Sequence, residues 1–127
     1  MSTIIGNGID IVECARLDEL IARHGQRFLD RIFTSAELDY CMNRRRQIEH
    51  LAGRFAAKEA ILKVIGTGWR DEISWKDMEI INDSAGKPEI NLKGKTAEIA
   101  QQLGIKKIIL SISHTEKYAV ASAIAID

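Results

Sequence analysis

The sequence has too few cysteines and histidines for a disulfide framework or a zinc site. Its two cysteines, Cys14 and Cys41, match neither a CxxC pair nor a zinc-ligand spacing, and we interpret them as reduced thiols. The three histidines at positions 24, 50 and 114 lie far apart, which disfavours zinc. The chain also lacks net charge, because 18 basic residues balance 18 acidic ones. This balance makes a general nucleic-acid binder unfavourable.

A long uninterrupted apolar run is also missing. The isoleucine-rich N-terminus is broken by Gly6, Asn7, Gly8 and Asp10, so it fits neither a signal peptide nor a membrane span. The sequence has no repeat, linker or low-complexity segment, and its 127 residues are 46% hydrophobic and 28% charged. This composition is typical of one globular domain. We therefore expect a single domain over residues 1–127, without a membrane partner, in the cytoplasm.

The hydrophobic pattern predicts helices early in the chain and hairpins late. Helices are expected at 16–23, 34–42, 47–66 and 94–103. Strands are expected at 3–13, 75–81, 88–92, 105–113 and 118–126. The capping-box pattern Thr34-Ser-Ala-Glu37 marks one helix start. Without a regular βαβ repeat, this order predicts an α+β fold with a mainly antiparallel sheet. We expect the long central helix to pack on the alternating alanines of the last strand.

The helix at 47–66 carries charge close to its apolar side. Taking about 100° per residue, Glu59 falls roughly 40° from the centre of the apolar stripe, and Lys63 follows one turn later. Lys58 flanks the stripe on its other side and is expected to extend outward along its stem. Small side chains form a trough nearby at Ala52, Ala56 and Ala60. Two interpretations stay open from this helix alone: a functional site, or an ordinary i,i+4 ion pair.

Asp10 is a second carboxylate in an apolar setting, on a strand whose glycines leave room for something to approach. A carboxylate at a strand-end turn is the alternative interpretation. Two carboxylates without a His or Cys cluster favour Mg²⁺, held together with waters and a phosphate. A lysine one turn from Glu59 would reach the same phosphate. The residues alone therefore predict a possible magnesium–phosphate site and no specific reaction.

Two further features stay open at this point. The run Arg44-Arg45-Arg46 precedes the long helix and opposes its macrodipole, so it indicates either an anion site or a solvated turn. Ser113-His114 has no accompanying triad or G-x-S-x-G motif, so it does not predict a nucleophile.

Several motifs together resemble one known family. They are Gly8-Ile-Asp10-Ile-Val-Glu-Cys-Ala-Arg16, Arg31-Ile-Phe-Thr34-x-x-Glu37, Leu51-Ala-Gly-Arg-Phe-Ala-Ala-Lys-Glu-Ala60-x-x-Lys63, Gly66-Thr-Gly68, Gly86-Lys-Pro88 and Ser111-Ile-Ser-His-Thr115. In this order and spacing the chain resembles the bacterial holo-[acyl-carrier-protein] synthases, of the 4′-phosphopantetheinyl transferase superfamily, from about residue 6 to its end. The combination is specific, although no single motif is.

The resemblance implies Mg²⁺-dependent transfer of 4′-phosphopantetheine from coenzyme A to a serine of apo-acyl carrier protein, in support of fatty acid biosynthesis. It implies that Asp10 and Glu59 hold Mg²⁺ on the coenzyme A diphosphate, that Lys63 neutralises this diphosphate, and that Glu59 is a candidate base. By the same resemblance, further coenzyme A contacts are Arg54, Gly86, Lys87, Pro88, Ser113, His114 and Thr115.

The resemblance also implies partners. Arg16, Arg23 and Arg27 would face the acidic acyl carrier protein, and the chain would form a homotrimer with active sites between subunits. The alanine trough would then give clearance to the diphosphate and the pantetheine arm. Two rival hypotheses are a non-catalytic coenzyme A or nucleotide-binding module, and a structural protein in which Asp10 and Glu59 form unrelated salt bridges.

Overall fold

A computed structural model describes residues 2–65 and 73–127 of the chain. The predicted Gly66-Thr-Gly68 segment lies outside the described residues. The helices are α1 (Cys14–His24), α2 (Gln26–Ile32), α3 (Ser35–Met42), α4 (Gln47–Ile65) and α5 (Gly94–Gln102). The strands are β1 (Ile4–Glu13), β2 (Met78–Asn82), β3 (Pro88–Leu92), β4 (Lys107–His114) and β5 (Tyr118–Ile126). The predicted α+β class is confirmed by this order.

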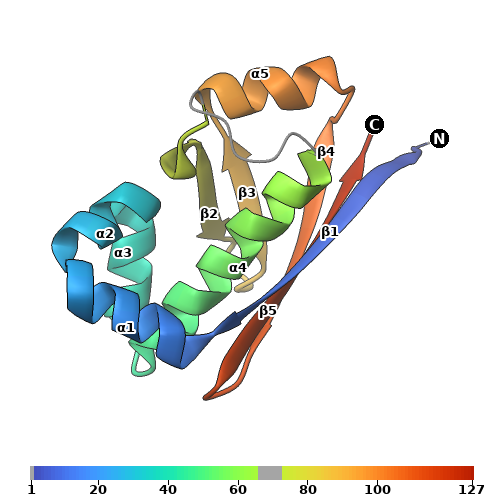
Figure 1. Ribbon diagram of the computed structural model, residues 1–127. Helices are drawn as coiled ribbons and strands as arrows, with labels where there is room; N and C mark the ends of the chain where they lie inside the picture. The colour runs from blue at the N-terminus through green and yellow to red at the C-terminus, as the bar shows by residue number, and fades with distance from the viewer. Residues whose placement is uncertain (1, 66–72) are drawn as a thin grey trace.

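The strands form two antiparallel sheets. One sheet has the order β1-β5-β4, and β2 and β3 form a separate two-stranded ribbon. Figure 1 shows α4 running diagonally across the three-stranded sheet, with α1, α2 and α3 gathered on one side and α5 at the top. The two chain ends meet, because the backbone N–H of Thr3 donates to Asp127 Oδ1 at 2.7 Å. Among the described residues, no helix has the length and apolar character needed to span a bilayer.

The inner face of the three-stranded sheet packs on α4. Alternating alanines at 119, 121, 123 and 125 of β5 are 0–1% exposed, which confirms the predicted contact between the last strand and the long helix. Asp10 pairs with Ala121 in the antiparallel register and therefore shares this inner face. Outer-face residues such as Ile9 and Ile11 stay exposed.

Gly8 allows β1 to approach α4 closely. A Cβ at this position would lie 2.3 Å from the carbonyl oxygen of Ala60 and 3.1 Å from Lys63 Cβ. The glycines of this strand were expected to leave room for something to approach, and at Gly8 the element that approaches is α4. The trough of Ala52, Ala56 and Ala60 is likewise closed, since each of these alanines is 0% exposed in the core. The small side chains therefore serve helix–sheet packing.

Lys58 does not extend to solvent as expected but is fully buried. Its ammonium donates to Glu37 Oε1 and to the carbonyl of Ile32, both at 2.7 Å, and to the carbonyl of Trp75 at 3.1 Å. Glu37 is also fully buried, and its Oε2 accepts from the backbone N–H of Ile80 at 2.9 Å. Burial lowers the pKa of Lys58, and Glu37 opposes this shift. This ion pair connects α2, α3, β2 and α4 in the core.

Local hydrogen bonds explain two differences from the predicted boundaries. The strand expected from Trp75 begins at Met78, because Ser74 Oγ accepts from the N–H of Lys76 and starts a 3₁₀ turn at Trp75–Asp77. The capping box at Thr34 and Glu37 is confirmed in full, with both of its hydrogen bonds present. α1 ends at Gly25, which has a φ of 61°, and α2 begins there as a separate short helix.

Candidate active site

Asp10 and Glu59 line one cavity between β1, α1 and α4. Its volume is about 500 Å³, and its walls also include Arg16 from α1, Phe55 from α4 and Tyr118 from β5. Asp10 lies on the inner face of the sheet, the same face as its buried register partner Ala121. Glu59 is half-buried on α4, which crosses this face of the sheet. The structure therefore brings the two predicted carboxylates and Arg16 together.

Lys63 forms an ion pair with Asp10. Its ammonium lies 3.0 Å from Asp10 Oδ1 and donates to the carbonyl of Ile9 at 2.9 Å. The alternative of a simple i,i+4 pair with Glu59 does not describe this contact, because the partner of Lys63 comes from the neighbouring strand. Since 55% of the lysine side chain is exposed, its ammonium also remains accessible from solvent.

The electrostatics of the cavity raise the pKa of Glu59 above its ordinary value. Burial is the main cause, the nearby Asp10 carboxylate adds to it, and Lys63 opposes it. The Asp10 charge therefore disfavours ionisation of Glu59, and Lys63 offsets part of this effect. A cation bound between the two carboxylates would favour the ionised form of Glu59, and hard carboxylate oxygens are suitable ligands for Mg²⁺.

Any metal in this cavity would depend on few protein ligands. Among the described residues, His, Cys, Asp and Glu side chains form no group of three or more that would hold a metal ion. Asp10 and Glu59 are the two residues that would hold such an ion, and one or two carboxylates are the usual protein ligands of Mg²⁺ in phosphate-handling sites. The assignment of Asp10 and Glu59 as Mg²⁺ ligands therefore stays a prediction.

Arg54 lies in a second cavity, on another side of α4. This cavity of about 430 Å³ is lined by Arg54, Tyr40, Arg44, Asn82 and Gly86, with Ala36, Ile80, Ile81, Asp83 and Ser84. Arg54 is only 4% exposed, and its Nη2 donates to Asn82 Oδ1 at 2.5 Å. The structure therefore joins two of the predicted coenzyme A residues, Arg54 and Gly86. Lys87 and Pro88 line a different cavity of about 300 Å³, between β3 and β4.

The predicted Ser113-His114-Thr115 segment does not present its three side chains together. Neighbouring residues of a strand point to opposite faces, so Ser113 and His114 lie on opposite sides of β4. His114 Nδ1 lies 2.8 Å from Glu49 Oε1, near the start of α4. Thr115 Oγ1 instead accepts from the backbone N–H of Tyr118 at 3.2 Å and stabilises the turn between β4 and β5.

His50 packs against His114 at the same end of α4. The two ring centroids are 4.9 Å apart. Burial lowers the pKa of His50, and the neighbouring His114 contributes to this shift.

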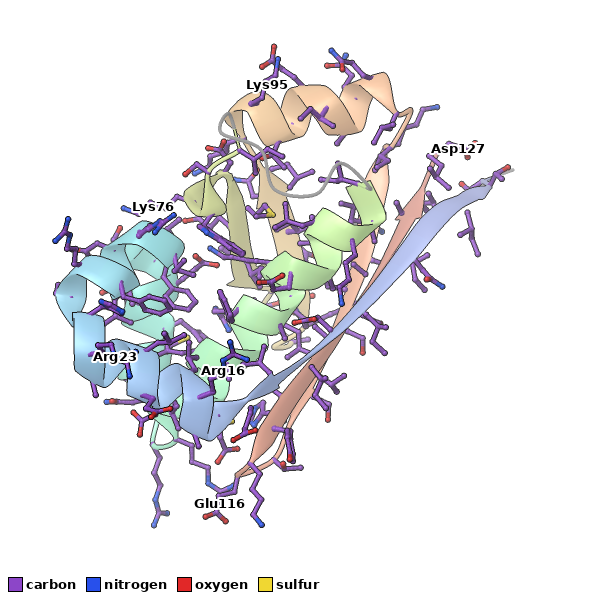
Figure 2. All side chains as sticks on the ribbon, viewed as in Figure 1. Arg16, Arg23, Lys76, Lys95, Glu116 and Asp127 are labelled. Carbon is purple, nitrogen blue, oxygen red and sulfur yellow. The ribbon has the colours of Figure 1, made fainter. Side chains whose placement is uncertain are left out.

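The predicted docking arginines are all exposed. Arg16 and Arg23 lie along α1, as Figure 2 shows, with Arg16 near the junction with β1 and Arg23 toward the other end of the helix. Arg27 lies beyond Gly25, on α2. Because Arg16 also lines the carboxylate cavity, a partner bound along these arginines would reach that cavity.

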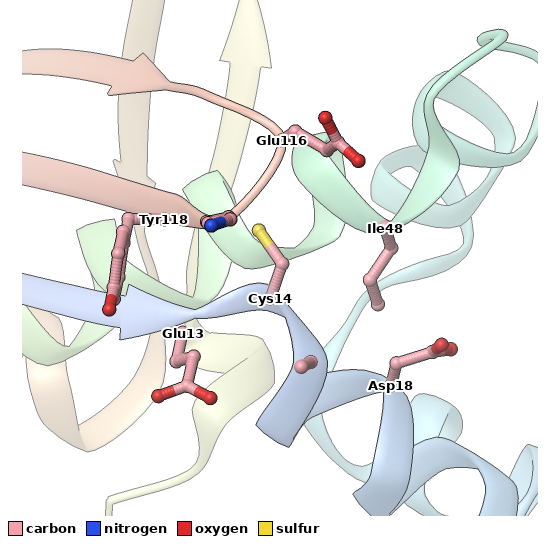
Figure 3. Close-up of a pocket in the computed structure, with 8 residues that line it drawn as sticks. Glu13, Cys14, Asp18, Ile48, Glu116 and Tyr118 are labelled. Carbon is pink, nitrogen blue, oxygen red and sulfur yellow. The ribbon is translucent and has the colours of Figure 1, made fainter.

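A fourth cavity adjoins the carboxylate cavity. Figure 3 shows its lining residues, which come from β1, α1, α4, the turn between β4 and β5, and the first residue of β5. Its volume is about 440 Å³, and it shares Glu13 and Tyr118 with the carboxylate cavity. Cys14 lies in its wall as a free buried cysteine, and burial raises the pKa of the thiol. None of the predicted site residues lines this cavity.

Sequence reasoning missed several polar neighbours of the predicted residues. Tyr40, Asn82 and Glu49 contact Arg54 or His114 across long sequence separations. No local sequence pattern predicts such contacts. The one available signal was that these residues lie near the family motifs in the sequence.

Comparisons with known proteins identify relatives along almost the whole chain. Residues 6–123 match the sequence model described as the 4′-phosphopantetheinyl transferase superfamily. The chain is 50% identical over 124 residues to the holo-[acyl-carrier-protein] synthase of Koribacter versatilis. The aligned region covers 98% of this chain and 99% of the relative. A relative of the same name from Geobacter sp. (strain M21) is 46% identical over 121 residues, with 95% and 97% covered.

Solved structures agree with these relatives. The crystal structure of holo-[acyl-carrier-protein] synthase from Neisseria meningitidis superposes on this chain with a TM-score of 0.88 and 36% sequence identity. The superposition covers 97% of this chain and 98% of the Neisseria chain. A synthase from Bacillus anthracis, solved in complex with CoA (3′,5′-ADP), has a TM-score of 0.79 and 36% identity, with 98% and 97% covered.

Proposed function

The chain belongs to the 4′-phosphopantetheinyl transferase superfamily and is a phosphopantetheinyl transferase, and we propose that its substrates are coenzyme A and an apo-acyl carrier protein. In this proposal it transfers 4′-phosphopantetheine to a carrier serine and releases adenosine 3′,5′-bisphosphate. The observation that carries the proposal is the pairing of Asp10 and Glu59 across one cavity, with Lys63 beside them. The coenzyme A complex of the B. anthracis relative supports the choice of substrate.

The reaction requires charge neutralisation at the diphosphate. The serine oxygen forms a bond to the phosphorus that carries pantetheine, and the bond from this phosphorus to the bridging oxygen breaks. The leaving bisphosphate takes the bridging oxygen and gains negative charge. Lys63 is positioned beside Asp10 to neutralise this charge, which suits a reaction that depends on electrostatic stabilisation.

Asp10 and Glu59 are the residues that would hold Mg²⁺. Their fit rests on carboxylate oxygens from two elements, β1 and α4, that line the same cavity. When bound, Mg²⁺ supplies further neutralisation of the substrate diphosphate.

Glu59 is our candidate for the group that accepts the proton of the carrier serine. A carboxylate with a raised pKa is a stronger base than an ordinary one, and burial beside Asp10 raises the pKa of Glu59. Asp10 is a less suitable base because it already forms an ion pair with Lys63.

Carrier docking is assigned to Arg16, Arg23 and Arg27. These exposed side chains lie on α1 and α2, and Arg16 reaches the wall of the carboxylate cavity. An acidic carrier helix would be attracted by this positive charge, which speeds association and orients the partner. Its serine would then approach Asp10 and Glu59.

We also propose a homotrimer with active sites between subunits. The outer face of the three-stranded sheet exposes large apolar side chains, with Ile9 at 63%, Ile11 at 64% and Tyr118 at 48%. Exposed apolar patches of this kind are typical of subunit interfaces. Within one protomer the predicted coenzyme A contacts lie in separate places, and residues of a neighbouring copy would complete a shared site.

The proposed setting is fatty acid biosynthesis in the cytoplasm. Transfer is tested by mixing the protein with apo-carrier, coenzyme A and Mg²⁺ and weighing the carrier by mass spectrometry. A phosphopantetheine adduct on the carrier is the expected result. Absence of the adduct with every divalent metal tried would refute the proposed transfer. Coenzyme A binding without any adduct would instead favour the non-catalytic module, which the comparisons do not favour.

A further inference from the structure

Small side chains form much of the contact between α4 and the three-stranded sheet. Ala56 and Ala60 of α4 are 0% exposed and belong to the same core cluster as the alternating alanines of β5. Gly8 of β1 also lies against the carbonyl of Ala60. Contacts between methyl groups are non-directional. This packing therefore determines the rotation of α4 about its axis less strictly than hydrogen bonds would.

Directional contacts to α4 come from the buried ammonium of Lys58. Its three N–H donors have three acceptors: Glu37 Oε1 and the carbonyl of Ile32, both at 2.7 Å, and the carbonyl of Trp75 at 3.1 Å. These acceptors belong to α3, to the last residue of α2 and to the 3₁₀ turn. Because the three donors point in fixed tetrahedral directions, α4 cannot turn without breaking at least one of these hydrogen bonds.

The acceptor Glu37 is held as firmly as the donor. Its Oε1 also accepts from the backbone N–H of Thr34, and its Oε2 accepts from the backbone N–H of Ile80, both at 2.9 Å. The carboxylate is thus connected to the start of α3 and to β2 while its side chain is 0% exposed. A buried polar network whose members are all satisfied makes its surroundings rigid.

Stability alone is a weak reason for this ion pair to be buried. Burial lowers the pKa of Lys58, so the core disfavours its charged form, and Glu37 opposes this shift. Replacement of a buried ion pair by uncharged residues of similar volume is often neutral or even stabilising. What such residues would not replace is the set of directional hydrogen bonds.

Two connections lead from Lys58 to the carboxylate cavity. Glu59 is the next residue of α4, and successive helical side chains are about 100° apart, so the direction of Lys58 sets the direction of Glu59. Trp75, whose carbonyl accepts from Lys58, packs its ring 5.4 Å from the ring centroid of Phe55. Phe55 and Glu59 both line the carboxylate cavity.

We propose that Lys58 and Glu37 are positioning residues of the candidate active site. Their ion pair sets the rotation of α4, so that Glu59 faces Asp10 across the cavity. It also holds the cavity wall at Phe55. This inference rests on the proposed function, because the two carboxylates are the groups assigned to that reaction.

The test variant is Glu37→Gln combined with Lys58→Met. This double substitution removes both charges and keeps side chains of similar length, so the protein should stay folded. We expect kcat for carrier modification to fall about tenfold or more, because a displacement of about 1 Å in a positioned site can cost about a hundredfold in rate. KM for coenzyme A should change less than kcat, since the affected carboxylates act on the reacting groups.

Ile99→Ala is the control for a loss of stability alone. Ile99 is a buried residue of α5 that lines none of the four cavities, and its truncation leaves a void in the core. Rates are referred to the folded fraction, which circular dichroism measures. The control should keep kcat within about twofold of wild type. An ion pair needed only for folding would make the double variant behave in the same way.

NMR measurements without substrate separate this inference from the proposed reaction. Residual dipolar couplings of backbone N–H groups report the tilt and rotation of α4 relative to β1, β4 and β5. They should agree between wild type and Ile99→Ala and differ in the double variant. An unchanged orientation of α4 or a wild-type kcat in the double variant, or an equal loss of kcat in Ile99→Ala, would overturn the inference. Failed transfer by a wild type whose α4 turns in the double variant would refute only the proposed function.

Discussion

A methyl group at Gly8 should disturb both the stability and the site of this protein. The added Cβ would lie 2.3 Å from the carbonyl oxygen of Ala60, about 1 Å closer than a normal carbon–oxygen contact. A helix carbonyl cannot move alone, so β1 and α4 must separate. Overpacking of this kind costs about 1–3 kcal/mol. Alanine also lowers the conformational entropy of the unfolded chain relative to glycine, which offsets about 0.4–1 kcal/mol of this cost. We expect Gly8→Ala to lower the free energy of unfolding by roughly 1–2 kcal/mol.

The same separation should reduce turnover, because Asp10 and Glu59 lie on the two elements that move apart. A displacement of about 1 Å in a positioned site can cost about a hundredfold in rate. Gly6→Ala is the matched control, since the nearest atom to its added Cβ is the carbonyl oxygen of Val64 at an ordinary 3.7 Å. Urea denaturation at one protein concentration and carrier-modification rates measure both effects. Wild-type stability and turnover in Gly8→Ala, or equal losses in Gly6→Ala, would refute the close-approach argument.

Three further predictions follow from buried and exposed charge. Lys58→Met should lower the free energy of unfolding by about 3–5 kcal/mol by leaving buried Glu37 without its cation, and adding Glu37→Gln should recover part of this loss in denaturant titrations. An equal or larger loss in the double variant would contradict the prediction. Because the pKa of Glu59 is raised in the folded protein, wild type loses stability as pH rises and this carboxyl ionises. Glu59→Gln does not ionise, so it should be more stable than wild type at neutral pH, and the difference should shrink in acid. An advantage that does not shrink in acid would contradict this reasoning. Arg23→Glu should raise KM for the carrier more than Lys95→Glu on α5, and added salt should raise the wild-type KM. Equal effects of the two substitutions, or a KM insensitive to salt, would argue against the docking face.

Local patterns in the sequence were sufficient for most elements of the fold. The capping box at Thr34 predicted the start of α3, and the alternating alanines of β5 predicted the contact with α4. In each case a few adjacent residues determine the backbone hydrogen bonds or the buried face. The 3₁₀ turn at Trp75–Asp77 was missed because the β-forming pattern of this segment concealed the cap at Ser74.

Long-range contacts could not be predicted in the same way. The outward placement of Lys58 was wrong because its acceptors at Ile32, Glu37 and Trp75 come from three distant segments. Lys63 pairs with Asp10 across a separation of 53 residues, which helical spacing alone does not reveal. The site was therefore predictable only as a set of residue types, and the fold supplies their contacts.

The most direct test of the account is the rate of carrier modification at saturating coenzyme A and Mg²⁺ in Asp10→Asn and Glu59→Gln. Glu98→Gln on α5, outside the lining of the carboxylate cavity, is the control for loss of one carboxylate. Thermal unfolding of each variant verifies that it is folded. The account predicts that both site variants lose turnover by about a hundredfold or more while the control stays near wild type. Near-normal turnover in both site variants would contradict the claim that these two carboxylates form the catalytic centre.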